Sequence, residues 1–118
     1  MDVSPQEIAA ALTLIDASLT NCENAQRRLK EGTASHSLSV HRIKALRIAR
    51  TLLLHKTHTF TPDELDAARV QLLSIRSKSE TGLAHAQPGS GTHTRFSRII
   101  AAMNTVLIHL DAAMEAHA

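Results

Sequence analysis

Eight histidines are spread over this chain of 118 residues, and imidazole is the side chain best suited to bind metals or exchange protons near neutral pH. His36 and His93 occupy matching places in two similar stretches, GTASHS at 32–37 and GSGTHT at 89–94. Together with Ser37 and Thr94 beside helix starts, they predict an anion site, because free N–H groups, hydroxyls and imidazoles can hold a phosphate. The alternative is ordinary capping, in which the hydroxyls satisfy the helix ends and the imidazoles are solvated.

A second pair, His55 and His58, has the i, i+3 spacing that can chelate a metal on one helical turn. His109 and His117 could reach the same end of a helical bundle. However, no third and fourth ligands are fixed by the spacing, and no Glu-x-x-His pair of the di-iron type occurs. The sequence therefore predicts neither a metal site nor any other cofactor.

The stretch His41-Arg42-Ile43-Lys44-Ala45 offers a different chemistry. It resembles the His-x-x-Lys-Gly motif of histidine phosphotransfer domains, which are four-helix bundles of about this length. The resemblance covers these five residues and implies that His41 would carry the phosphoryl group, with Lys44 as its charge partner. The glycine of the family, which leaves room for the response regulator, is Ala45 here.

Positive charge is concentrated in residues 27–58, which hold eight Lys or Arg side chains against one acid, whereas the remainder holds five against ten. The candidate basic surface consists of Arg42, Lys44, Arg47 and Arg50. These side chains could contact the phosphates of a nucleic acid. Because the chain has only two aromatic residues for stacking on bases, we favour the alternative that the basic segment packs against acidic neighbours of the same chain.

Two helix starts organise the whole chain, SPQE at 4–7 and TPDE at 61–64. Each combines a hydroxyl cap, a proline at the first helical position and a glutamate that reaches back to the cap. Their offset of 57 recurs downstream and predicts two duplicated helical hairpins, about 4–57 and 61–116. We expect helices at about 5–31, 37–57, 62–86 and 94–116, and a single domain over 1–118. The fold class is an all-α, antiparallel four-helix bundle in which the first and third loops lie at the same end.

Five apolar side chains fall outside the predicted core stripes of these helices and form a candidate association surface: Leu14, Ile43, Leu54, Val70 and Ile108. Such a surface favours a homodimer or another helical protein as partner. No nucleophile with its base and no paired carboxylates stand out, so we predict no catalytic residues and a non-enzymatic protein. The single Cys22, the absence of a signal peptide and the absence of a membrane-spanning run lead us to expect a cytoplasmic protein without a membrane partner.

Overall fold

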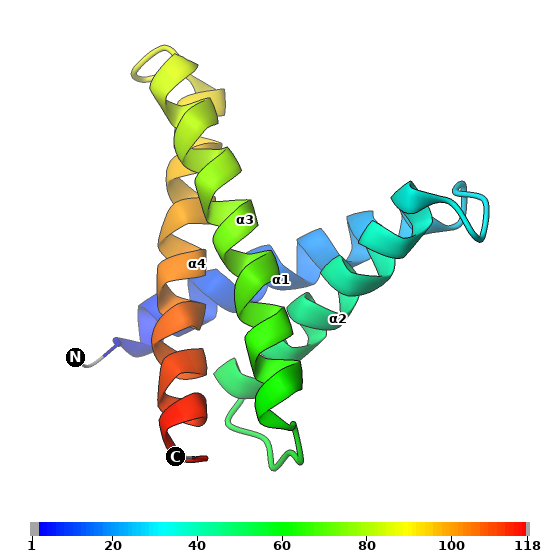
Figure 1. Cartoon of the computed structure of the whole chain (residues 1–118). Helices are drawn as coiled ribbons and strands as arrows, with labels where there is room; N and C mark the ends of the chain where they lie inside the picture. The colour runs from blue at the N-terminus through cyan, green and yellow to red at the C-terminus, as the bar shows by residue number, and fades with distance from the viewer. Residues whose placement is uncertain (1–2, 118) are drawn as a thin grey trace.

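A computed structural model describes residues 3–117 of the chain, which form four helices. Helix α1 spans Pro5–Gln26, α2 spans Ala34–Leu53, α3 spans Pro62–His85 and α4 spans Gly91–Glu115. Helices α1 and α2 run antiparallel, as do α3 and α4, so that each pair forms a helical hairpin (Figure 1). The predicted all-α four-helix bundle is confirmed.

Both predicted capping boxes are present at the starts of α1 and α3. The Ser4 hydroxyl accepts a hydrogen bond from the Glu7 N–H, and the Glu7 carboxylate accepts one from the Ser4 N–H. Thr61 and Glu64 make the same reciprocal pair. These bonds satisfy N–H groups that the helix itself leaves without partners.

Helices α2 and α4 begin earlier than predicted, and α1 ends earlier. The Thr33 hydroxyl caps α2 and the Ser90 hydroxyl caps α4, each accepting an N–H three residues on. After α1, residues 27–29 form tight turns that lead into Gly32. Gly32 and Gly89 have φ of +86° and +84°, a left-handed conformation that glycine adopts without steric cost. All four caps thus keep the offset of 57, from 4 to 61 and from 33 to 90.

The two hairpins cross instead of lying side by side along their lengths (Figure 1). Beyond the crossing they diverge into two arms, which gives the molecule a flat outline of 42 × 41 × 20 Å. The loop 27–33 lies at the tip of one arm and the loop 86–90 at the tip of the other. The expectation that these loops share one end of the bundle is therefore wrong.

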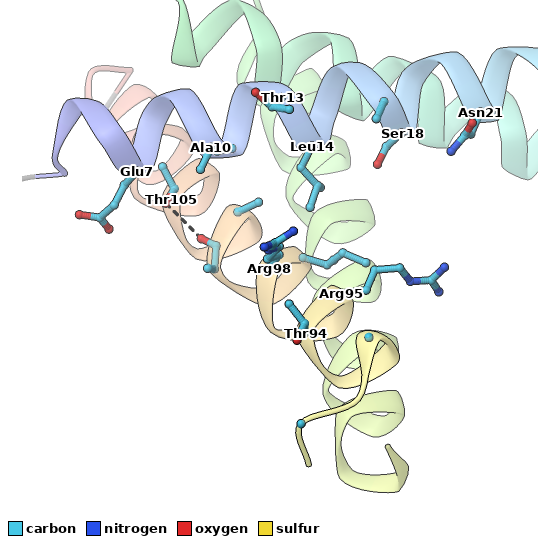
Figure 2. A pocket seen from close by; sticks show the side chains of 17 residues that line it. Glu7, Ala10, Thr13, Leu14, Ser18, Asn21, Thr94, Arg95, Arg98 and Thr105 are labelled. Atoms are coloured by element: carbon cyan, nitrogen blue, oxygen red, sulfur yellow. Dashed lines mark hydrogen bonds between the residues drawn. The ribbon is translucent and has the colours of Figure 1, made fainter. Parts of the chain in front are cut away.

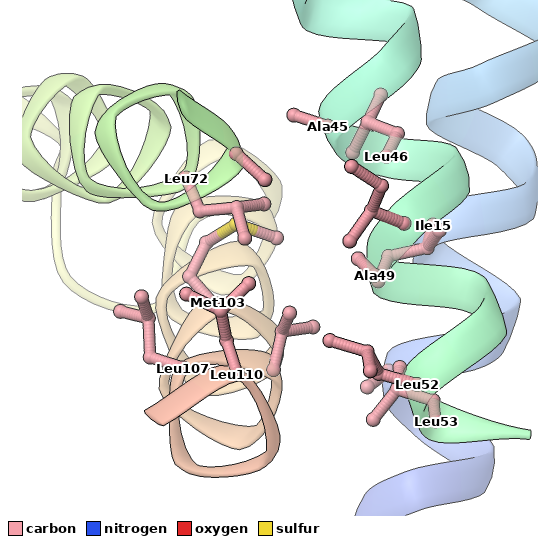
Figure 3. Packing of buried hydrophobic residues seen from close by; sticks show 14 of the residues in the cluster. Ile15, Ala45, Leu46, Ala49, Leu52, Leu53, Leu72, Met103, Leu107 and Leu110 are labelled. Atoms are coloured by element: carbon pink, nitrogen blue, oxygen red, sulfur yellow. The ribbon is translucent and has the colours of Figure 1, made fainter. Parts of the chain in front are cut away.

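The core lies where the hairpins cross, between α2 of one hairpin and α3 and α4 of the other (Figure 3). Helix α2 contacts α1, α3 and α4, and α4 likewise contacts the other three helices, whereas no Cα atoms in the described parts of α1 and α3 lie within 8 Å of one another. Seven residues of α2 are consequently buried, including Ile43, which is 4% exposed. Ile43 was predicted to lie on an association surface, and the structure corrects that prediction, because a helix packed against three neighbours buries more than one stripe.

Candidate docking groove between the hairpins

The predicted anion site is not assembled, because His36 and His93 lie near the tips of separate arms. The N–H group of each is already capped, by Thr33 and Ser90 respectively. Ser37 and Thr94 lie inside the helices and not at their starts. Capping, the alternative interpretation of these hydroxyl-rich segments, is what the structure shows.

Three other histidines do come together. His55, His58 and His109 line a shallow cavity of about 300 Å³ between the end of α2 and α4. The rings of His55 and His109 are 5.4 Å apart, and the His109 Nδ1–H donates to the Thr105 carbonyl at 2.9 Å. Within the described part of the chain, no three His, Cys, Asp or Glu side chains are placed to hold a metal ion.

His41, the residue matched to the phosphorylated histidine, is exposed on α2. Lys44, which would be its charge partner, instead reaches Glu64 of α3, with Nζ and Oε2 3.3 Å apart. Ala45 is 1% exposed and faces the core. The five-residue resemblance therefore lies on a helix whose lysine and alanine already serve the packing of the hairpins.

The candidate basic surface is matched by polar groups of α1 and α3. Arg47 binds Glu23 and Arg50 binds Asp16, each with 2.8 Å between nitrogen and oxygen. Arg42 donates to the side-chain oxygen of Gln71 at 3.2 Å. The basic helix α2 thus packs against polar and acidic side chains of the same chain, as the uneven charge distribution of the sequence favours. These pairs leave less unpaired positive charge on α2 for an external polyanion.

Glu64 stands at the end of this network and carries two interactions. The Thr61 backbone N–H donates to its carboxylate, and Lys44 lies beside it. The hydrogen bond from Thr61 and then Lys44 hold the pKa of Glu64 below its ordinary value of 4.5. Glu64 thus joins α2 to the start of α3 in its charged form.

An open groove of about 1060 Å³ lies between α1 and α4, where the arms diverge (Figure 2). Its lining is mostly apolar, and many of its residues are small. Ala11 and Ala102 are buried at its base, and Leu14 points from α1 toward α4. Alanine at these positions allows the two helices to approach closely where they cross, and the space widens beyond that point.

One wall of the groove is basic. Arg95 and Arg98 of α4 both line it and are exposed. Among residues 3–117, neither guanidinium has a carboxylate within 4.0 Å. The Arg95 guanidinium lies over the Phe96 ring, 5.3 Å from its centroid. The groove is therefore an apolar trough with a cationic edge.

Of the five residues predicted for an association surface, only Leu14 lines this groove. Val70 is 59% and Ile108 is 38% exposed, so both remain on the outside of the α3–α4 hairpin, while Leu54 is half-buried. Ala10, Ala17 and the two arginines are not predicted from the sequence, because alanine is common on both buried and exposed faces of helices. One signal was available, since Arg95 and Arg98 have no acidic neighbour three or four residues away on their helix.

Comparison of the chain with protein-family models, with curated proteins and with solved structures found no match. Across residues 3–117, no helix is both long and apolar enough to cross a membrane.

Proposed function

We propose that this chain is a non-enzymatic helical-bundle protein that acts through protein–protein association, as a dimer, an adaptor or a helical chaperone. The observation that carries the proposal is the open, mostly apolar groove between α1 and α4. Contiguous apolar surface that stays accessible is one mark of sites where another protein binds. Val70 of α3 and Ile108 of α4 are further exposed apolar side chains outside the groove.

Two features favour association over the competing functions. The basic side chains of α2 that would contact a nucleic acid are engaged with Glu23, Asp16 and Glu64. The candidate chemistry of the histidines is divided between separate places, with His36 and His93 on different arms. A docking module needs neither arrangement, because its affinity comes from shape and buried apolar area.

The duplicated-hairpin origin and the cytoplasmic location belong to the same proposal. The four helix caps repeat at an offset of 57, and Gly32 and Gly89 keep the same offset and the same left-handed backbone. A lone cysteine, Cys22, suits a reducing compartment because it has no second cysteine in the chain to pair with.

The test compares two alanine-to-glutamate variants of α1. Ala17 is exposed and lines the groove, whereas Ala9 is exposed on the same helix outside it. Ala17→Glu places a charge on the apolar surface and is expected to reduce recovery of partner protein, or the dimer mass in native mass spectrometry, about tenfold or more. Ala9→Glu is expected to behave as wild type, and circular dichroism melts should show both variants folded. Equal recovery with both variants would refute a role for the groove.

A further inference from the structure

The carboxylates of α1 are directed away from the groove or are already engaged. Asp16 and Glu23 pair with arginines of α2. Glu7 is the only acidic residue in the described lining, and one of its oxygens accepts the Ser4 N–H in the capping box. The positive charge of Arg95 and Arg98 is therefore not balanced by the opposite wall.

Each wall of the groove is long enough to contact a helix of about four turns. Its lining runs from Glu7 to Asn21 on α1 and from Gly91 to Thr105 on α4. At the standard rise of about 1.5 Å per residue, each wall is roughly 20 Å long. An occupant in helical form would span it with about 14 residues.

The walls favour a helix over an extended segment. Both are α-helices, whose backbone N–H and C=O groups are bonded within the helix, so they offer no strand edge for a β-strand to pair with. A helical occupant has its own backbone groups satisfied as well. It would insert apolar side chains between the alanines of the two walls and leave its polar edge beside α4.

A second copy of the chain is a poorer occupant on charge grounds. Its own groove face presents the same two arginines, and only Glu7 could offset them. Like charges brought together across an interface weaken binding and select against the wrong partner. The arginines instead match carboxylates spaced three or four residues apart on a partner helix.

From this arrangement we infer that the α1–α4 groove binds an amphipathic helix of another protein that carries Asp or Glu along the edge next to Arg95 and Arg98. The inference rests on the proposed function and specifies its partner. The apolar face of that helix supplies the affinity, and the carboxylates fix its direction and register in the groove.

The test uses a synthetic, covalently stapled helix of about 14 residues, with Ala and Leu on one face, Glu along one edge and a single Trp. The chain contains no Trp or Tyr, so the fluorescence of the peptide Trp is observed without a protein background. A matched peptide has Gln in place of every Glu. The protein is wild type, Arg95→Glu/Arg98→Glu, or the control Arg28→Glu, which changes an exposed charge in the turn after α1.

We expect saturable binding of the Glu peptide to wild type and to Arg28→Glu, and about tenfold weaker binding to the double variant at low salt. The difference should shrink at high salt, because the charges are exposed and screened. The Gln peptide should bind wild type more weakly than the Glu peptide does.

The outcomes separate the inference from the proposed function. If the Glu and Gln peptides bind wild type equally, or if the Glu peptide does not bind, the acidic helix is refuted as the occupant. If wild type sediments as a dimer that Ala17→Glu dissociates, the occupant is a second copy, which also refutes the inference but supports association through the groove. If Ala17→Glu changes neither peptide binding nor self-association, the proposed function fails as well.

Discussion

Gly82 of α3 packs against the ring of Phe96 of α4, and replacing this glycine by alanine tests the packing of the α3–α4 arm. A Cβ at Gly82 would lie 2.5 Å from Cζ of Phe96 and 2.6 and 2.8 Å from the two Cε atoms. Carbon atoms in contact are normally about 3.5–4.0 Å apart, so the ring must move by about 1 Å. The Arg95 guanidinium lies over the same ring, so a displacement of the Phe96 ring is expected to move Arg95 at the groove as well.

Two opposing contributions determine how Gly82→Ala changes the free energy of unfolding. Alanine favours the helix by about 1 kcal/mol relative to glycine. Overpacking typically costs about 1–3 kcal/mol. The expected net effect is a loss of about 0–2 kcal/mol in the free energy of unfolding. In a Phe96→Ala background the obstruction is gone, and the same substitution should stabilise the chain by about 1 kcal/mol. The coupling between the two substitutions is thus about 1–3 kcal/mol.

Urea unfolding followed by far-UV circular dichroism measures this coupling, since the chain has no tryptophan to report by fluorescence. Gly91→Ala is the matched control, because a Cβ there meets nothing within 4 Å and the backbone φ is not positive. That control should be neutral or stabilising by up to about 1 kcal/mol. If Gly82→Ala stabilises wild type as much as it stabilises the Phe96→Ala background, the close approach described here is refuted.

Three further predictions concern stability. Ile43→Glu should unfold the chain or lower the free energy of unfolding by at least about 3 kcal/mol, because it buries a charge at a site that is 4% exposed. Val70→Glu, at a site that is 59% exposed, should change the free energy of unfolding by under about 0.5 kcal/mol in the same urea assay. Similar effects of the two variants would contradict the buried position of Ile43. Because the pKa of Glu64 is lowered in the folded state, the stability that its charged form contributes is present above pH 4.5 and is lost as the pH falls through the folded-state pKa. Glu64→Gln should therefore flatten the pH dependence of the melting temperature in that range. An unchanged slope would refute this link between Glu64 and stability. Thr61→Ala should cost about 1 kcal/mol through loss of the cap.

Local features were predictable because their causes lie within a few residues. The pairs Ser4–Glu7 and Thr61–Glu64 form as their spacing requires, since a capping box depends only on residues within one turn. The sequence pattern predicts the starts of α2 and α4 about three residues too late, after the observed caps Thr33 and Ser90. Several hydroxyl residues follow one another in each loop, and any of them satisfies the pattern for a cap.

The arrangement of the hairpins could not be predicted in the same way. Apolar periodicity shows which face of a helix is buried but not the angle at which two hairpins meet. That angle separates His36 from His93, buries Ile43 and opens the groove lined by Ala17. The charge asymmetry of the sequence was more informative about which segments pack together. A basic helix in a chain of low net charge favours packing against acidic segments, and Arg50 of α2 pairs with Asp16 of α1.

The most direct test of association through the groove is site-specific photocrosslinking in cells. A benzophenone side chain is introduced at Ala17 or Ala101, which line the groove, or at Ala9 or Ala67, which are exposed elsewhere. The account predicts a discrete crosslinked product of higher mass from Ala17 and Ala101 and none from the two controls. Crosslinks from Ala9 or Ala67 alone, or equally from all four positions, would contradict the claim that partners bind between α1 and α4.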